Sequence, residues 1–300
     1  MILEKPTESQ MKYLKTLNFY QNESKMEEDV DIIIDWLSKQ PHLPNVTDRV
    51  WLKHFHIACK NNLLKTKNLL DSYFVIRAEL PELFDDLTTD AKWVENAMRI
   101  GKISLMPKLT PEGDRIQIFR TVENNSEFDP QAMFKGSLKT IDYLMRREPI
   151  YSMIIIIDCQ HFRLSYLLSF TPSLTAMLVR SIKDATPLRI KGLHYVNPPK
   201  FITQLVTVFK IFLPAKVQKR IMVHESYSDL HKYVPKEVLP EEYGGEEESI
   251  IKLEEELIRK FKEDDEFWKT RPQADLSKRV IQQKPNELDM QGTFRKLTID

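Results

Sequence analysis

Two short stretches of the chain gather basic side chains in a pattern that suits phosphate binding. Arg189 and Lys191 lie two residues apart in a predicted strand, so both should project from one face. Lys216, Lys219 and Arg220 have i, i+3, i+4 spacing, which places them on one face of a predicted helix. Guanidinium groups match phosphate oxygens with paired hydrogen bonds, and ammonium groups bind them as point charges. The alternative interpretation is two unrelated, solvated patches with carboxylate partners.

A strongly apolar segment directly precedes the second basic stretch. Residues 199–212 are predicted to form a helix, whose apolar surface is interrupted from residue 201 onward only by Thr203, Gln204, Thr207 and Lys210. Such a helix is roughly 21 Å long, whereas a bilayer core is about 30 Å thick. An oily helix beside a cationic segment indicates a part that works at a membrane surface. The alternative is an ordinary core helix with a solvated basic end.

The sequence offers no support for catalysis or metal binding. His161, His194, His224 and His231 lack HxxxH and HxH spacing, and no serine lies in a Gly-x-Ser-x-Gly elbow. With seven glycines in the chain, there is also no glycine-rich phosphate loop. We expect His194 to be a hydrogen-bonded core histidine and Asp158 to serve in a cap or turn. The prediction is a protein that is not an enzyme and holds no metal or cofactor.

Composition limits the classes of protein that the chain can be. Its 44 basic residues balance 44 acidic ones, so no global field favours nucleic acid. Two cysteines, Cys59 and Cys159, fit a reducing compartment better than a disulfide framework. No run of about 18 apolar residues occurs, and the N-terminal MILEKPTESQ has no apolar signal core. We expect a soluble, cytoplasmic, monomeric protein with no nucleic-acid partner.

The pattern of elements predicts a helical N-terminal region followed by an α/β domain. Residues 1–92 have the pattern of charged, amphipathic helices, and from about residue 100 strands alternate with helices. The expected strands are 101–106, 115–122, 151–157, 188–196 and 221–224. The expected helices are 27–39, two within 48–84 divided near residues 61–62, then 129–147, 171–185, 199–212 and 246–267. The expected domains are a helical bundle at 1–92, an α/β domain at 93–245, and a C-terminal helix and tail at 246–300.

The order of these segments, together with several local motifs, resembles the CRAL-TRIO family. Residues 52–86 resemble its N-terminal module, with Ala-Cys-Lys before a leucine-rich helix and a closing Pro-Glu-Leu-Phe. DCQHFRLSYLLSFTP at 158–172 resembles the stretch after its central strand, and LPEEYGG at 239–245 resembles its domain-ending turn. PLRIKGLHYVNPP at 187–199 and FLPAKVQKRI at 212–221 are similar to the tocopherol-transfer and retinaldehyde-binding branch.

The resemblance implies a fold and an internal ligand. The resemblance to CRAL-TRIO proteins implies a mixed sheet covered by helices and an apolar cavity closed by a gate helix. It also implies a small helical bundle before this domain. Carried over to matching positions, the expected gate residues are Phe201, Ile202, Leu205 and Phe209. The expected pocket residues are Phe134, Ser137, Ile141, Met153, Phe170, Leu178, Ile182, Leu188, Ile190 and Leu193.

The resemblance also implies a ligand for the basic residues. Arg189, Lys191, Lys216, Lys219 and Arg220 match the positions by which this branch binds phosphatidylinositol bisphosphates. We therefore expect a protein that binds one small hydrophobic lipid, such as a tocopherol, retinoid or similar isoprenoid, and transfers it at phosphoinositide-containing membranes. Its association with the membrane surface, as a peripheral membrane protein, would be transient. The alternatives are a non-carrier phosphoinositide-binding adaptor with a filled core, and an α/β hydrolase with a nucleophile beside a histidine in the cavity.

Three positions depart from the family pattern. His161 stands where a glycine is common, and such a position can require a positive φ. Ile57 replaces an arginine that commonly precedes Ala-Cys-Lys, and Ile141 replaces a small polar residue of related carriers. The departures at His161 and Ile57 leave the resemblance intact but weaken the transfer of ligand identity from the family. Three apolar residues of the tail are expected to dock as an extended strip, namely Phe294, Leu297 and Ile299.

Overall fold

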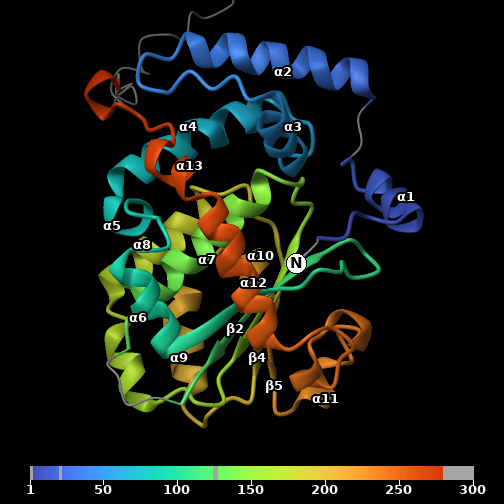
Figure 1. Cartoon of the computed structure of the whole chain (residues 1–300), viewed down its shortest axis with the longest axis vertical. Coiled ribbons are helices and arrows are strands. Elements are labelled where there is room, and N and C mark those ends of the chain that lie inside the picture. The colour runs from blue at the N-terminus through green and yellow to red at the C-terminus, as the bar shows by residue number, and fades with distance from the viewer. Residues whose placement is uncertain (1–2, 20–21, 124–127, 280–300) are drawn as a thin grey trace, which may run out of the picture.

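The computed structural model describes residues 3–19, 22–123 and 128–279, and Figure 1 shows how their helices and strands are arranged. The tail residues Phe294, Leu297 and Ile299, which were expected to dock as a strip, lie outside the described residues. Within the described part of the chain, each helix is too short or too polar to span a bilayer.

A five-stranded mixed sheet forms the centre of the fold. Its strands lie in the order β1-β2-β3-β4-β5, with β1 antiparallel to β2 and the other neighbours parallel. Side chains alternate between the two faces, so Ile154 and Ile156 of β3 enter one core while Ile155 and Ile157 enter the other. The strands are β1 (Gly101–Leu105), β2 (Arg115–Thr121), β3 (Met153–Asp158), β4 (Ile190–Val196) and β5 (Ile221–His224).

Three helices cover one face of the sheet. Thr171 begins the second of them by accepting a hydrogen bond from the Leu174 N–H at 3.2 Å, and Pro172 occupies the first turn, where no N–H partner is needed. A 3-10 helix and a short α-helix complete this side. The elements are α7 (Pro130–Met145), the 3-10 helix Leu164–Ser169, α8 (Pro172–Lys183), α9 (Ile202–Phe212) and α10 (Ala215–Gln218).

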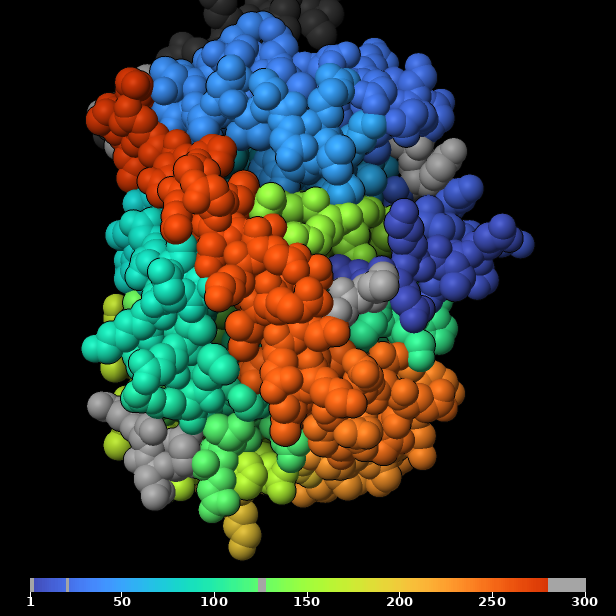
Figure 2. All heavy atoms as spheres, viewed as in Figure 1, coloured from blue at the N-terminus to red at the C-terminus, as the bar shows by residue number. Residues whose placement is uncertain are grey.

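The chain after β5 covers the opposite face. Leu230 of α11 (Tyr227–Leu230), with Leu239 and Tyr243, packs on the isoleucines of β2 and β3. Helix α12 (Ile250–Glu263) then lies on β1, where its Glu254 carboxylate accepts the Ile103 N–H at 3.1 Å. Figure 2 shows α12 and α13 (Asp265–Thr270) crossing this side of the molecule toward the N-terminal helices.

The N-terminal helices form a bundle that packs on α7. A buried ion pair joins the two parts, because the Arg77 guanidinium contacts the Asp142 carboxylate at 2.6 Å and also donates to the Ala185 carbonyl. Loss of one partner would leave the other charge buried and unpaired. The helices are α1 (Glu8–Thr16), α2 (Glu23–Ser38), α3 (Arg49–Ala58), α4 (Leu63–Glu79), α5 (Pro81–Phe84) and α6 (Lys92–Ile100), the last leading into β1.

The segment after α12 ties back onto this bundle. The Asp264 carboxylate lies 2.8 Å from Arg147, Arg271 donates to the Phe84 carbonyl, and the Asp275 N–H donates to the His42 carbonyl at 2.9 Å. Residues 264–279 therefore bridge the bundle and the α/β domain.

The expected elements are confirmed, with differences at their ends. β5 has its expected bounds, and two helices, α3 and α4, meet near residues 61–62. Helix α9 begins at Ile202 and not at 199, because the Pro199 carbonyl accepts the Ile202 N–H in a turn before it. The single helix expected at 246–267 is two helices, α12 and α13, divided at Asp264. Helix α6 was not predicted.

Candidate functional site

An apolar cavity of about 270 Å³ lies between the sheet and helices α7, α8 and α9. Its floor is formed by side chains of β2, β3 and β4, and its roof by α7, the C-terminal half of α8 and α9. Residues 213–217, between α9 and the end of α10, close one side. The volume is near the lower limit of about 300–1,000 Å³ that is usual for ligand pockets.

Most of the pocket residues expected from the family resemblance line this cavity. Met153 does not, since it is fully buried in the core between α7 and the bundle. Leu178 does not either, although it is fully buried in the core that adjoins the cavity. The expected residues in the wall are Phe134, Ser137, Ile141, Phe170, Ile182, Leu188, Ile190 and Leu193.

Helix α9 contributes two of its four expected gate residues to the wall, Leu205 and Phe209. The Phe209 ring lies between Phe134 and Phe170, with ring centroids 6.4 Å and 5.3 Å away. Ile202 is buried in the adjoining core and Phe201 is half-buried beside it. The aromatic contact around Phe209 closes the cavity beneath α9.

The outer side of α9 is more polar than expected of a helix that is buried all round. Its polar residues Thr203, Gln204, Thr207 and Lys210 are all exposed, and they share that surface with Ile211, whose side chain is 74% exposed. The helix is therefore amphipathic, with an apolar inner face and one prominent apolar residue outside.

Several wall residues were not predicted from the sequence. The most informative is Gln117, which β2 places in the same row as Ile155 and Leu193. Period-two alternation in β2 could have identified it, because its neighbours Ile116 and Ile118 belong to the opposite core. The others include Phe119, Met133, Leu138, Cys159, Phe162, Val179, Lys183, Tyr195, Leu213, Pro214 and Val217.

A larger hollow of about 660 Å³ lies elsewhere, between the N-terminal segment, residues 109–115 and the end of α12. Charged side chains of both signs line it, including Arg115, whose guanidinium lies 2.8 Å from the Glu148 carboxylate. Arg115 also donates to the Glu4 carbonyl at 3.0 Å, so this pair fastens the N-terminal segment to β2. Because its walls are charged and internally paired, this hollow does not suit an apolar ligand.

Lys60, a cation that was not predicted, lies near Arg189 and Lys216, and Arg189 in turn lies near Arg220. Burial, and then the positive charges of Arg189, Lys216 and Lys65, lower the pKa of Lys60. Burial, and then the charge of Arg220, likewise lower the pKa of Arg189. Phe19 lies between Lys60 and Arg189, with each cation 5.1 Å from its ring centroid. Residues from the bundle, β4 and the α10–β5 connection thus form one basic group.

The local geometry of the other two expected cations differs from the prediction. A bulge in β4 follows Ile190, since Met153 pairs with Ile190 while Ile154 pairs with Gly192, so Lys191 interrupts the simple alternation of the strand. Helix α10 ends at Gln218, with Lys219 as its cap. Arg220 lies after the helix, where it donates to the Ile190 carbonyl. The single helical face expected for residues 216–220 is therefore wrong at its C-terminal end, although Lys191, Lys216 and Lys219 are all exposed.

The basic group is not neutralised within the described part of the chain. Lys60, Arg189, Lys216 and Arg220 form no ion pair with a carboxylate among residues 3–19, 22–123 and 128–279. Only the charge of Asp114 partly opposes the lowering of the Arg189 pKa. Four cations held together without carboxylate partners repel one another, and a bound anion would relieve that repulsion. The alternative of two separate patches with carboxylate partners is thus not what the described residues form.

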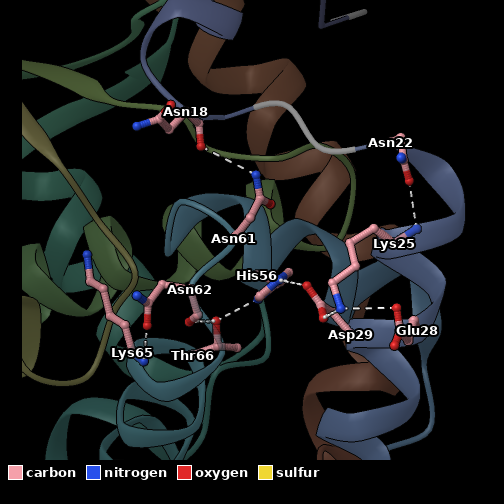
Figure 3. A network of polar contacts seen from close by, with 10 residues as sticks. All are labelled: Asn18, Asn22, Lys25, Glu28, Asp29, His56, Asn61, Asn62, Lys65 and Thr66. Carbon is pink, nitrogen blue, oxygen red and sulfur yellow. Dashed lines mark hydrogen bonds and ion pairs between the residues drawn. The ribbon is translucent and has the colours of Figure 1, made fainter.

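The turn that presents Lys60 is fixed by a polar network in the bundle, drawn in Figure 3. The buried His56 joins α2 to α4, with one ring nitrogen 3.2 Å from the Asp29 carboxylate and the other 2.8 Å from the Thr66 hydroxyl. Burial lowers the pKa of His56. The Asn61 amide donates to the Asn18 carbonyl at 3.4 Å. Lys60 follows α3 with a φ of 60°, a left-handed conformation that is uncommon for lysine.

The candidate catalytic residues are occupied with structural contacts. Asp158 accepts hydrogen bonds from the Asn197 amide at 3.0 Å and the Tyr227 hydroxyl at 2.8 Å. His194 and His224 stack and share a 2.8 Å hydrogen bond, while burial and then His224 lower the pKa of His194 to about 4. Within the described residues, no cluster of three potential metal ligands occurs. The expectation of a core role for His194 fits these contacts.

Two of the departures noted in the sequence have a structural outcome. His161 has no positive φ, and its N–H donates to the Thr121 hydroxyl at 3.1 Å, so a glycine is not needed here. Ile57 packs against the bundle core near Tyr151. The bundle still supplies a cation to the basic group, but from Lys60, three residues later.

Comparison with known proteins agrees with these features. The family model for the CRAL/TRIO domain matches residues 101–245, and a model described as Pinta-like, UBA domain matches residues 22–92. Clavesin-1 of Xenopus laevis is 26% identical over 234 residues, which cover 76% of this chain and 70% of that protein. Human alpha-tocopherol transfer protein-like is 27% identical over 222 residues, or 72% of this chain and 64% of that protein.

Among solved structures, that of Sfh5 covers 84% of this chain and 93% of its own, with 12% identity and a TM-score of 0.45. The strand order, the helices on both faces and the apolar cavity match what the family resemblance implied. The match at 101–245 spans β1 to the turn that follows Tyr243. Residues 101–245 are therefore a CRAL/TRIO domain, in agreement with the family that the sequence motifs resemble.

Proposed function

We propose that this protein carries one small hydrophobic lipid in the cavity under α9 and exchanges it at membranes that contain phosphoinositides. The observation that carries the proposal is the apolar cavity of about 270 Å³ behind the ring of Phe209. A non-carrier adaptor would be expected to fill this space with its own side chains. A hydrolase would need a nucleophile beside a histidine in the wall, and no histidine lines the cavity among the described residues.

Burial of the cargo supplies the driving force for loading. Removing apolar surface from water contributes about 25 cal/mol per Å². A lipid with about 400 Å² of apolar surface could thus gain on the order of 10 kcal/mol before the entropic costs of binding. An affinity of this kind keeps an insoluble lipid out of water between membranes.

The opening of the cavity would be coupled to a membrane through exposed apolar side chains. Ile211 of α9 is 74% exposed, and Leu164 and Leu168 of the 3-10 helix are 61% and 84% exposed. The 3-10 helix lies next to α9 at its C-terminal end, where Phe170, the residue that follows it, contacts Phe209. Insertion of these residues into a leaflet would favour movement of α9 away from the sheet, since lipid replaces the contacts that α9 loses.

The basic group is proposed to bind the headgroup of the membrane lipid. Arg189, Lys191, Lys216, Lys219 and Arg220 are the positions expected from the sequence, and Lys60 adds a cation from the bundle. Phosphate oxygens are suited to a mixture of guanidinium and ammonium groups. These cations have no carboxylate ion-pair partner among the described residues, which supports an anionic ligand, and a bisphosphorylated inositol headgroup would match several cations together.

The class of cargo follows from the cavity and from the relatives. Its walls are mainly aliphatic and aromatic, which suits a compact isoprenoid, retinoid or tocopherol better than a charged lipid. Relatives named alpha-tocopherol transfer protein-like support the same class. Such a carrier would act in the cytoplasm as a monomer and touch membranes transiently.

The anion site can be tested with a variant that leaves the cavity unaltered. Lys216→Ala with Lys219→Ala removes two exposed charges, each worth roughly 1 kcal/mol at an anionic leaflet, so affinity for vesicles with phosphatidylinositol 4,5-bisphosphate should fall about 30-fold. Vesicle flotation measures this affinity, and retention of farnesol measures loading, which should not change. Arg220 is left intact because it holds the Ile190 carbonyl in the cavity wall.

The matched control removes two exposed lysines from α12, Lys252→Ala with Lys262→Ala. This control has the same net charge as the test variant and should bind the vesicles like the wild type. Equal vesicle affinity of the test variant and this control would refute the proposed headgroup site and leave the proposal of lipid carriage standing.

A further inference from the structure

Gln117 places a primary amide in the otherwise apolar floor of the cavity. Its side chain is only 3% exposed, and its Nε2 nitrogen is buried with no hydrogen-bond partner among the described residues. The side-chain amide has two donor hydrogens and an acceptor oxygen, and a 180° turn of the amide exchanges the two ends. A polar group of this kind is unusual beside Phe119, Ile155 and Leu193.

The position of Gln117 is fixed by the sheet. β2 pairs Gln117 with Leu105 on one side and Ile155 on the other, and Leu193 of β4 continues the same row. The row is covered by α7, whose Ser137 and Ile141 also line the cavity. Both flanking strands and the helix above are ordered, so the amide cannot easily swing out to water.

A buried amide without a partner has a free-energy cost. Leaving such a group unsatisfied costs roughly 1–3 kcal/mol, whereas leucine or isoleucine at this place would cost nothing of the kind. Ile116 and Ile118 show that β2 is otherwise rich in isoleucine. A ligand atom that bonds to the amide would remove the cost each time the cavity is filled.

We propose that Gln117 is a specificity-determining residue that hydrogen-bonds a neutral oxygen of the cargo. This inference rests on the proposed lipid-carrier function and names the chemical class of its substrate: an apolar lipid with one hydroxyl or carbonyl oxygen. An alcohol can both accept from the Nε2 hydrogen and donate to the Oε1 oxygen, so it satisfies the amide most fully. A hydrocarbon leaves the amide unpaired.

The surroundings of the amide select against a charged group. A carboxylate moved into this wall would need a cation to offset its desolvation. Lys183 is the one charged side chain in the described wall of the cavity, and its ammonium lies 3.8 Å from Asp184 with about half of the side chain in solvent. Fatty acids are thus disfavoured relative to alcohols, aldehydes and ketones of similar size.

The amide lies on the opposite wall from the position where related carriers have a small polar residue. That position is Ile141 on α7 in this chain, so α7 offers no polar group there. Other polar residues of the wall are Ser137, Cys159 and Tyr195, but Gln117 is the wall residue that has a buried side-chain atom without a hydrogen-bond partner in the described structure. The polar end of the cargo would therefore point toward β2.

The test compares two lipids that share a carbon skeleton but differ in one oxygen. The full-length protein is equilibrated with phosphatidylcholine vesicles that contain equal amounts of farnesol and farnesene, separated by gel filtration and extracted, and both lipids are quantified by gas chromatography. Gln117→Leu removes the amide at nearly constant volume. A hydrogen bond of about 1.4 kcal/mol corresponds to a tenfold change, so the bound farnesol-to-farnesene ratio should fall about tenfold.

Two further measurements secure the interpretation. Gln160→Leu makes the same exchange at an exposed glutamine outside the cavity wall and should leave the ratio within about twofold of wild type. Thermal unfolding of the lipid-free protein should show that Gln117→Leu is at least as stable as wild type, because an unsatisfied buried amide is gone. Comparing each variant with wild type cancels the different partitioning of the two lipids into the vesicles.

The possible outcomes separate this inference from the proposed function. A tenfold fall confined to Gln117→Leu supports the inference. If both lipids bind but the ratio is the same in wild type and Gln117→Leu, or if Gln160→Leu lowers it equally, Gln117 does not bind the oxygen of the lipid and the carrier function stands. If neither lipid is retained by the wild type, the carrier function for this class fails, and the inference fails with it.

Discussion

Lys60 occupies a backbone position that favours glycine. It follows helix α3 with a φ of 60°, and a left-handed conformation at this point of a helix is easiest for a residue without a Cβ atom. It also lies near the like charges of Arg189 and Lys216. Both the backbone conformation and the neighbouring positive charges are unfavourable for lysine at this position. A role of the Lys60 charge in binding a ligand would explain why lysine is present.

Replacing Lys60 with glycine should therefore change stability and binding in opposite directions. The strain of a non-glycine residue in this region is of order 1 kcal/mol, so Lys60→Gly should raise the midpoint of thermal unfolding. Loss of one cation should weaken binding to phosphatidylinositol 4,5-bisphosphate vesicles about fivefold. Asn18→Gly is the control, since Asn18 has a φ of 63° and no charge. Wild-type vesicle affinity in Lys60→Gly would remove Lys60 from the site.

For single residues, the sequence predicted which residues belong to a site better than it predicted which other residues they contact. The basic residues at 189, 216 and 220 were recognised as a group from spacing and resemblance, but Lys60 was not, because its proximity depends on how the bundle packs on the domain. Gln117 was missed for a similar reason. A single polar residue within a strand does not reveal whether its side chain meets a core, a cavity or solvent.

Helix α9 shows what could and could not be predicted about an element. Its apolar character and its end before Pro214 follow from the sequence, and two of four expected gate residues face the cavity. Its start was misplaced because a turn at Pro199 precedes it, and its exposed polar side was not recognised as one surface. The α10 prediction failed at Arg220, because four residues of helix are too few to hold a helical phase to residue 220.

The membrane role of α9 is tested best on its outer surface. Ile211→Asp puts a charge on a side chain that is exposed and does not line the cavity. A carboxylate is disfavoured in a leaflet by up to a few kcal/mol, so transfer of farnesol between vesicles should slow at least tenfold, while equilibrium loading is unchanged. Stopped-flow transfer to vesicles with a quencher measures the rate.

The matched control is Ile251→Asp, since Ile251 is 56% exposed on α12, which packs on β1 away from the cavity. It should transfer lipid at the wild-type rate. Equal slowing by both variants would mean a general effect of surface charge, and no slowing by Ile211→Asp would exclude contact of this part of α9 with the membrane.

The whole molecule joins two sites through shared elements. Arg220 of the basic group donates to the Ile190 carbonyl, and Ile190 itself lines the cavity. Pro214 and Val217, just before Arg220, line it as well. The proposed headgroup binding and the proposed movement of α9 would therefore influence one another through residues 213–220. The resemblance at 187–199 and 212–221 predicted both halves of this arrangement, because motifs of a family retain long-range order that local patterns lack.

The packing of the C-terminal segment could not be predicted from the sequence. Residues 270–279 are polar and gave no apolar pattern to follow, yet Arg271 and Asp275 contact the bundle through backbone hydrogen bonds, and Asp264 pairs with Arg147 just after α7. Such contacts depend on the tertiary structure, which brings residues far apart in the chain together. These contacts hold the bundle and the α/β domain together.

The most direct test of lipid carriage is native mass spectrometry of the full-length protein after incubation with vesicles made from a tissue lipid extract. The cavity predicts one bound lipid per chain, released by organic extraction and identified as a neutral, oxygen-bearing hydrophobic molecule. A folded protein that binds phosphatidylinositol 4,5-bisphosphate vesicles but remains free of internal lipid at every extract concentration would contradict carriage and favour the adaptor.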